Sequence, residues 1–121
     1  MHDEHTSQPY KWINIYREMY TNCTIVKSNL EILHLKPVNG SDHDLSFFEN
    51  IREVHGYVLV ALNLVSRVPL TSLRVIRGRR RRLDRYSLFV AKNADSSVGL
   101  RHLEMPSLIG ELQRVILPLT A

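Results

Sequence analysis

The side chains best suited to covalent or acid–base chemistry are one cysteine, Cys23, and six histidines. Nothing in the sequence next to Cys23 indicates that its thiol is an activated nucleophile. His43 lies between two aspartates in a predicted turn, with too few convergent ligands to hold a metal. The chain contains none of the sequence signatures GxGxxG, GxxxxGK[ST], GxSxG or HExxH. We therefore expect no catalytic residues, no metal and no cofactor.

Six arginines within nine positions dominate the charge of the chain. They are Arg77, Arg79, Arg80, Arg81, Arg82 and Arg85, and without them the formal net charge of +4 would be −2. A solvated loop between two strands is one interpretation, because such a loop needs no partner. A nucleic-acid or nuclear-import patch and the recognition site of a basic-specific protease are the others. One function hypothesis is therefore a basic intracellular adaptor or nucleic-acid-binding protein that uses the cluster from Arg77 to Arg85.

Two triplets have the Asn-x-Ser/Thr pattern of N-glycosylation sites. One begins at Asn22 and the other at Asn39. Asn39 lies in an evident turn, from which a bulky glycan can project into solvent. Both sites matter only if the chain is secreted.

The elements that position these residues begin with a predicted helix. The length of 121 residues and the hydrophobic fraction of 44% suit a single globular domain. Residues 1–8 are polar and are expected to form a flexible tail, and a helical pattern starts at Pro9. Its apolar stripe is Trp12, Ile13, Tyr16, Met19 and Tyr20. The sequence has no apolar run long enough to cross a membrane and no secretion signal in its first 20 residues.

After Cys23 the pattern changes to short strands separated by turn residues. Strands are predicted at residues 30–35, 57–62, 75–76 and 86–91, which are rich in Val, Ile, Leu and Tyr. Loops are predicted at residues 37–44, 79–85 and 92–99. A single short turn is predicted at residues 47–51 and a second helix at residues 107–116.

A repeated unit links these strands. Each copy reads apolar-x-x-(Val/Ile)-x-(Gly/Ser) and leads into an apolar strand, with the small residue at Ser28, Gly56 and Gly78. The small residues are 28 and 22 positions apart. Repeats of this length that carry a strand are typical of solenoids, in which stacked copies bury a shared core. The alignment predicts parallel strands with two columns of neighbours. These columns are Ile32, Val60 and Phe89, followed by Leu33, Ala61 and Val90.

The residues also resemble a known family. The runs that match are Asp44-Leu-Ser-Phe47, Ile51-Arg-Glu-Val54, Gly56-Tyr-Val-Leu-Val-Ala-Leu-Asn63, Val68-Pro-Leu70, Leu73-Arg-Val-Ile-Arg-Gly78, Tyr86-Ser-Leu-Phe-Val90, Asn93-Ala-Asp95 and Gly99-Leu100. In these runs the chain is similar to the receptor L domain, and more narrowly to the first L domain of the epidermal growth factor receptor family. Residues 10–117 carry the resemblance.

The resemblance implies a mainly β fold, a right-handed parallel β-helix with an N-terminal amphipathic helix, over residues 9–121. It implies an extracellular, growth-factor-binding part of a receptor tyrosine kinase, incomplete at both ends and without its own signal peptide or membrane span. The implied partners are an epidermal-growth-factor-like ligand and the second L domain and cysteine-rich domains of the parent receptor, which would also dimerise. No nucleic acid is expected on this interpretation.

The resemblance also implies the site residues. In the family's first L domain the growth factor lies along one sheet, beside equivalent places in successive strands. Carried over, these places are His34, Leu62 and Ala91, with Lys92 next. The family's acidic contact residue aligns with Leu83. The family pairs the cysteine that matches Cys23 with one nearer the N-terminus, and this chain contains no such partner.

Overall fold

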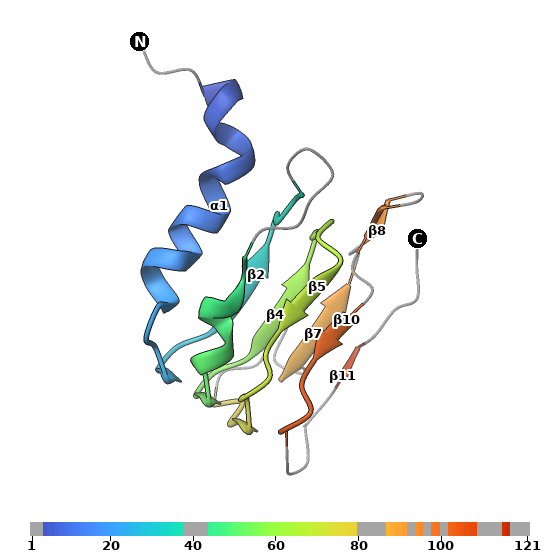
Figure 1. Cartoon of the computed structure of the whole chain (residues 1–121). Helices are drawn as coiled ribbons and strands as arrows, with labels where there is room; N and C mark the ends of the chain where they lie inside the picture. The colour runs from blue at the N-terminus through green and yellow to red at the C-terminus, as the bar shows by residue number, and fades with distance from the viewer. Residues whose placement is uncertain are drawn as a thin grey trace.

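The computed structural model describes residues 4–37, 44–79, 87–91, 94–95, 98–99, 102–108 and 115–116 (Figure 1). Helix α1 (Glu4–Tyr20) comes first, and a 3₁₀ turn, η1 (Ser46–Asn50), separates the second strand from the third. The strands are β1 (Ile25–Val26), β2 (Leu30–Leu33), β3 (Glu53–Val54), β4 (Val58–Ala61), β5 (Arg67–Pro69), β6 (Val75–Ile76), β7 (Leu88–Ala91), β8 (Ala94–Asp95), β9 (Val98–Gly99), β10 (His102–Glu104) and β11 (Val115–Ile116). The described part of the chain is therefore mainly β with one α-helix.

Helix α1 begins five residues earlier than predicted, so the expected tail over residues 1–8 is wrong for residues 4–8. Glutamate and glutamine favour helices, and this stretch extends the helix on the N-terminal side of Pro9. The predicted stripe is confirmed for its centre, where Ile13, Tyr16 and Tyr20 are buried. Met19 lies at the margin of the stripe and remains 57% exposed. No helix among the described residues has the length and apolar character needed to span a bilayer.

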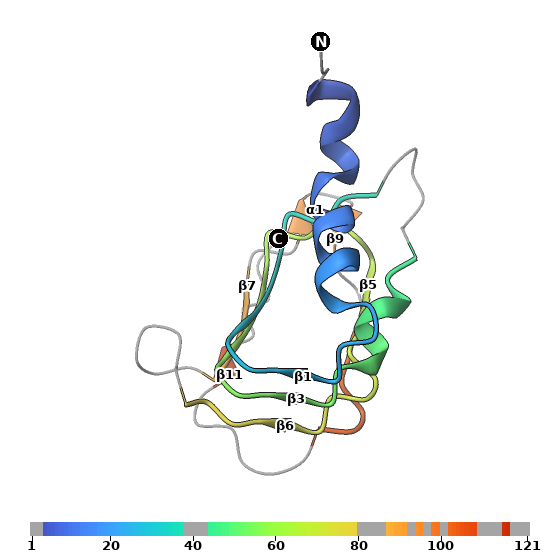
Figure 2. The same cartoon turned by 90° about the vertical axis from the view of Figure 1, so that its left-hand side faces the viewer.

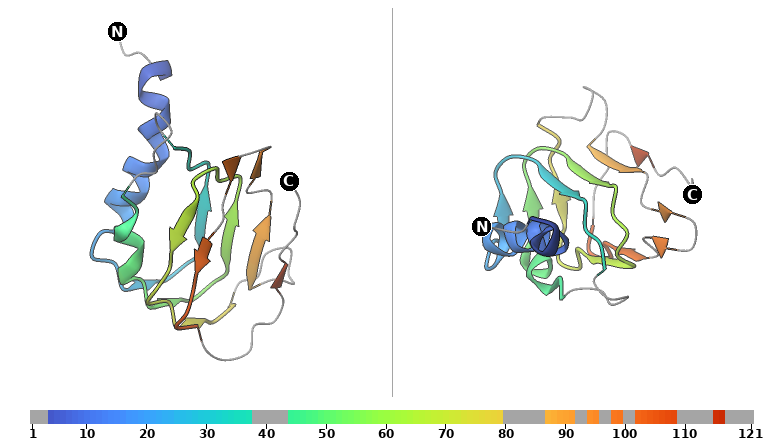
Figure 3. Two further views of the ribbon diagram at one scale, coloured as in Figure 1. Left: turned by 45° about the vertical axis from the view of Figure 1, so that its right-hand side comes forward. Right: turned by 90° about the horizontal axis from the view of Figure 1, so that it is seen from above.

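Three parallel sheets form the body of the molecule. Their strand orders are β1-β3-β6, β11-β7-β4-β2 and β10-β5. Figure 2 shows them on three different sides of the interior. The chain advances from α1 at one end to β11 at the other, as both views in Figure 3 also show. The predicted stacking of repeated units in parallel is thereby confirmed for the described strands.

The register of the third repeat differs from the prediction by one residue. The paired positions are Ile32, Val60 and Val90 in one column and Leu33, Ala61 and Ala91 in the next. Phe89 pairs instead with Leu59. Because strand side chains alternate, this register turns Leu88 inward, where it is 2% exposed. The arginine-rich insert lengthens the third repeat. Aligning Tyr86 with Tyr57 therefore misplaces β7 by one position.

The small residues of the repeat lie where the backbones of neighbouring copies approach closely. The Gly56 amide donates to the Ser28 carbonyl, and the Gly78 amide donates to the Gly56 carbonyl. A Cβ on Gly56 would lie 1.9 Å from the Asn29 Oδ1 atom. Gly78 has a φ of 64°, which glycine adopts readily. The repeated small residue thus has a steric cause at Gly56 and a conformational one at Gly78.

An aromatic cluster closes the N-terminal end of the stack. The rings of Tyr16 and Tyr20 lie 6.0 and 5.8 Å from the Phe48 ring of η1. The Tyr16 hydroxyl accepts a hydrogen bond from the Leu33 amide at 2.9 Å and lies 3.2 Å from the Leu33 carbonyl, to which it donates. Since β2 is the outer strand of its sheet, this hydroxyl satisfies backbone groups on an otherwise open edge.

The remaining predictions are partly confirmed. The short turn at residues 47–51 corresponds to η1. The predicted loop 92–99 contains the antiparallel pair β8 and β9, so it is a hairpin where it is described. The predicted helix over 107–116 is wrong at its end, because β11 pairs there with β7. The loops 37–44 and 79–85 lie mostly outside the described residues.

Candidate ligand-binding face

One face of the sheet formed by β2, β4 and β7 points away from the core. Its outward side chains, which we call the outer face, are Glu31, Leu33, Leu59, Ala61, Phe89 and Ala91. Leu59 is 5% exposed, and Ala61 and Ala91 are 9% exposed, although none of the three belongs to the core cluster. Leu59, Ala61 and Ala91 therefore form an apolar layer that is largely covered, although it lies outside the core cluster.

His34 and Leu62 occupy equivalent corners at the ends of β2 and β4. Each follows a residue of the paired positions Leu33 and Ala61. Both are exposed, and their φ angles are 65° and 60°. The left-handed conformation costs a residue with a Cβ about 1–2 kcal/mol, and such strain is often found at binding sites. The two side chains are presented from neighbouring strands, whose spacing is about 4.8 Å.

Helix α1 contributes to the surroundings of His34. The Trp12 ring lies 5.3 Å from the imidazole of His34, measured between ring centroids. The Lys11 ammonium lies 5.6 Å from the centroid of the same indole ring, close enough for a cation–π contact. This edge of the outer face thus combines an aromatic ring, an imidazole and a cation.

Asn63 fixes the backbone on both sides of the His34 corner. Its side-chain amide donates to the Ile32 carbonyl at 2.8 Å, and its Oδ1 atom accepts from the Leu35 amide at 3.0 Å. The side chain is fully buried, so these bonds satisfy backbone groups that water cannot reach. The corner is therefore held in place from inside the fold.

A carboxylate also lies at this edge of the outer face, on the strand that leads to His34. The Tyr57 hydroxyl donates a hydrogen bond to the Glu31 Oε2 atom. Glu31 is the acidic member of the six residues of the outer face, and it comes from the outermost strand, β2. This arrangement holds a negative charge beside the apolar layer, where it could pair with a basic group on a ligand.

The structure brings together only some of the residues that the sequence predicted. His34 and Leu62 lie at equivalent places, whereas Ala91 pairs with Ala61 and lies one position earlier. The residue that follows Ala91, and so corresponds to Leu62, is Lys92. Lys92 and Leu83 lie outside the described residues. The equivalence of Ala91 with His34 and Leu62 is thus wrong, for the same one-residue difference in register.

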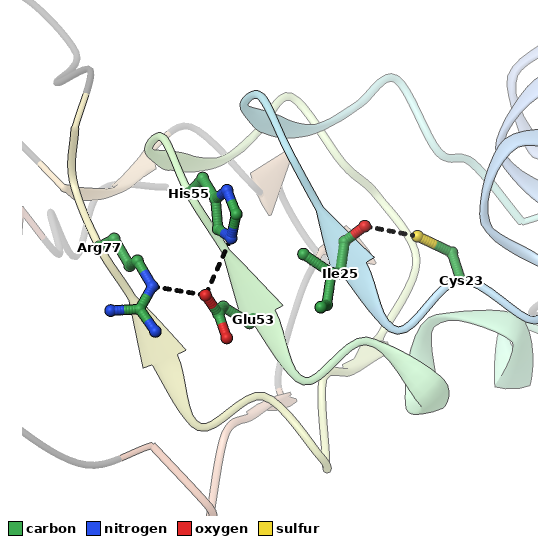
Figure 4. A network of polar contacts seen from close by, with 5 residues as sticks. All are labelled: Cys23, Ile25, Glu53, His55 and Arg77. Carbon is green, nitrogen blue, oxygen red and sulfur yellow. Dashed lines mark hydrogen bonds and ion pairs between the residues drawn. The ribbon is translucent and has the colours of Figure 1, made fainter.

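Asn22 and Cys23 lie between α1 and β1, away from the His34 corner. Asn22 is exposed in the turn after α1 with a φ of 64°. Cys23 is a free, half-buried cysteine, and its thiol lies 3.4 Å from the Ile25 carbonyl, to which it donates (Figure 4). Asn39 lies outside the described residues.

Sequence reasoning missed Trp12, Glu31 and Asn63 as members of the site. The alternation of side chains in residues 30–33 could have placed Glu31 on the outer face. The position of Asn63, one residue after the exposed Leu62, signals a buried polar corner only once the register is known. The contact between Trp12 and His34 has no signal in the sequence, because it depends on where α1 packs.

The comparisons with known proteins agree with one another. The family model of the receptor L domain matches residues 22–117. Receptor tyrosine-protein kinase erbB-4 of Mus musculus is 45% identical over 94 residues, which cover 76% of this chain and 7% of that protein. Receptor tyrosine-protein kinase erbB-2 of Rattus norvegicus is 38% identical over 114 residues, 84% of this chain and 9% of that protein.

The epidermal growth factor receptor of Gallus gallus is a third relative. It is 42% identical over 94 residues, which cover 76% of this chain and 13% of the receptor. The chain therefore spans between 7% and 13% of the length of these three receptors. The part of this chain that matches these receptors is the receptor L domain, over residues 22–117.

Proposed function

This chain belongs to the receptor L domain family, and we propose that it is an extracellular growth-factor-binding domain of an epidermal growth factor receptor-like tyrosine kinase. In this proposal it supplies half of the surface that holds an epidermal-growth-factor-like ligand. A second L domain of the parent receptor supplies the other half. The cysteine-rich domains and receptor dimerisation belong to that parent.

The observation that carries the proposal is the pair of strained corners at His34 and Leu62. The residues that follow two adjacent strands both adopt the strained left-handed conformation. Both present an exposed side chain at equivalent positions of the register. Leu62 is 44% exposed at the border of an apolar layer. An exposed leucine beside apolar neighbours gains free energy when a ligand covers it, at roughly 25 cal/mol per Å² of buried apolar surface. Ala91, Lys92 and Leu83 remain contacts that the family resemblance predicts.

The proposed architecture is a right-handed β-helix. Support comes from the parallel pairing of β1, β3 and β6 and of β2, β4 and β7 in consecutive repeats. Parallel strands joined by crossovers are right-handed in the great majority of proteins. Extracellular placement, with glycans on Asn22 and Asn39, is part of the same proposal.

The experiment replaces the first L domain of a growth-factor receptor ectodomain with this chain and measures ligand affinity. Leu62→Asp is expected to weaken binding at least about tenfold, because it places a charge where apolar surface is covered. Ile25→Asp is the matched control, since Ile25 is 45% exposed but lies on another sheet. Equal affinity of the Leu62→Asp chimera and its parent would contradict the proposal.

A further inference from the structure

A second surface of the molecule, on the β1-β3-β6 sheet, is strongly basic. Five exposed cationic side chains gather there, and we call them the basic face: Lys27, Arg52, Arg74, Arg77 and Arg79. Figure 2 shows this sheet on a different side of the molecule from β7 and β11. The basic face is therefore separate from the outer face that carries His34 and Leu62.

Arg52 and Arg74 are stacked by the backbone. The Arg52 amide donates to the Thr24 carbonyl at 2.7 Å, and the Arg74 amide donates to the Arg52 carbonyl at 2.8 Å. The two arginines thus occupy the same place in successive repeats, directly before β3 and β6, which pair at a strand spacing of about 4.8 Å. Neither forms an ion pair within the described part of the chain. Two like charges so close repel each other unless an anion lies between them.

The two arginines border a hollow in the surface. It has a volume of about 360 Å³ and is lined by Thr24, Ile25, Arg52, Glu53, Arg74 and Val75. Ile25 and Val75 pair with Glu53 from either side, so they supply apolar walls. A ligand in this hollow would meet two guanidinium groups and two aliphatic side chains.

The carboxylate in the hollow is already paired. The Glu53 Oε2 atom accepts from Arg77 Nε and lies 2.9 Å from His55 Nε2 (Figure 4). The hydrogen bond from Arg77 lowers the pKa of Glu53 below its usual value, and the charge of Arg77 and the contact with His55 act in the same direction. Glu53 therefore balances the Arg77 side of the face, and the positive charge of Arg52 and Arg74 is left for a ligand.

We propose that the basic face binds a sulfated polysaccharide, with sulfate groups held by Arg52 and Arg74. A guanidinium group donates two parallel hydrogen bonds to an oxyanion, and two stacked groups can share one sulfate. The apolar walls of the hollow suit the carbon face of a sugar ring. The choice of a polysaccharide rests on the extracellular placement proposed above. No exposed aromatic ring among the residues that line the hollow offers a nucleic-acid base a stacking platform.

Titration calorimetry of the whole chain with a heparin oligosaccharide tests the proposal. The double variant Arg52→Gln/Arg74→Gln is expected to bind about tenfold more weakly at physiological salt. Its affinity is also expected to fall less steeply with salt, because fewer counterions are released. Arg52→Lys/Arg74→Lys should recover only part of the affinity, since lysine keeps the charge but lacks the planar fork.

The matched control is Lys11→Gln/Arg17→Gln on α1, which removes the same charge from another part of the surface. It is expected to change heparin affinity less than about twofold, the scale of a long-range charge effect. Equal losses in the control and the Arg52/Arg74 variant would overturn the proposal, because net charge alone would explain them. Unchanged binding in the Arg52/Arg74 variant, with loss in Arg80→Gln/Arg81→Gln/Arg82→Gln, would also overturn it.

Double-stranded DNA of equal charge is the competing ligand. The proposal expects DNA to bind more weakly than heparin and to depend less on Arg52 and Arg74. Equal or tighter DNA binding that needs the same two arginines would overturn the assignment to a polysaccharide. Growth-factor binding by the chimera is measured in a separate experiment. A failure of the growth-factor proposal can therefore be distinguished from a failure of the polysaccharide proposal.

Discussion

At the scale of single residues, the buried Asn63 side chain joins two repeats. It bonds to the Ile32 carbonyl and the Leu35 amide, two backbone groups that flank the His34 corner. A hydrophobic residue at this position would leave both groups buried and without these bonds, which is more costly than losing a bond exposed to water. The strained backbone of His34 thus depends on a side chain from the next repeat.

Asn63→Ala is therefore expected to destabilise the protein by about 2–4 kcal/mol, with one or two buried backbone groups left unsatisfied. Thermal unfolding followed by circular dichroism measures the change. Asn50→Ala is the control, because Asn50 is exposed at the end of η1. If both variants melt at the same temperature as the parent, Asn63 does not support the corner.

At the scale of elements, the alternation of inward and outward side chains organises the sheets. Val60 lies in the column between Ile32 and Val90 and is fully buried. Leu62 lies two residues further along the same chain and is exposed. The same substitution at Val60 and at Leu62 therefore compares its effect on stability at a buried and at an exposed position of one segment.

Val60→Asp is expected to lower stability by several kcal/mol, because it buries a charge without a partner. Leu62→Asp is expected to change stability by less than about 1 kcal/mol, as is usual for exposed positions. Chemical denaturation of the two variants and the parent gives both values. A Val60→Asp variant as stable as Leu62→Asp would show that β4 does not face the core through Val60.

The stability that the packing of α1 contributes is expected to fall at alkaline pH. Burial raises the pKa of Tyr20 from its usual 10.0 to about 12, and the nearby Tyr16 acts in the same direction. The folded state keeps this proton while the unfolded state loses it, so the contribution to stability is complete below pH 10 and lost as the pH rises towards 12. Tyr20→Phe should lose less stability over this pH interval than the parent does. Equal losses measured by denaturation at each pH would contradict this account.

The sequence predicted most of these elements because their signals are local. The helical period from Trp12 to Tyr20 and the repeat up to Gly78 fix the type and order of the elements. The register of β7 could not be predicted from the same repeat. An insertion before residue 87 breaks the spacing, and only the burial of Leu88, with the partial burial of Val90 against the core, shows which side chains face inward.

At the scale of the whole molecule, the outer face and the corners beside it combine elements that are distant in the sequence. His34 and Leu62 were predicted as contacts through the family resemblance, whereas their left-handed backbone was not predicted. Trp12 could not be predicted, because it reaches His34 through the packing of α1 against the end of the stack. The basic face has the same origin, since Arg52 and Arg74 become neighbours only when β3 and β6 pair.

A single outer face of this kind is expected to bind a growth factor weakly. If the ligand is held between two L domains, separating the halves removes an effective-concentration advantage of about 10²–10⁴. Leu59 is only 5% exposed and Ala61 and Ala91 only 9%, so the outer face offers a ligand little new apolar contact besides Leu62 at its border. Titration calorimetry should therefore find much tighter binding when this chain is joined to a second L domain than when it is alone. Nanomolar binding by the chain alone would contradict the half-site and indicate a complete binding protein.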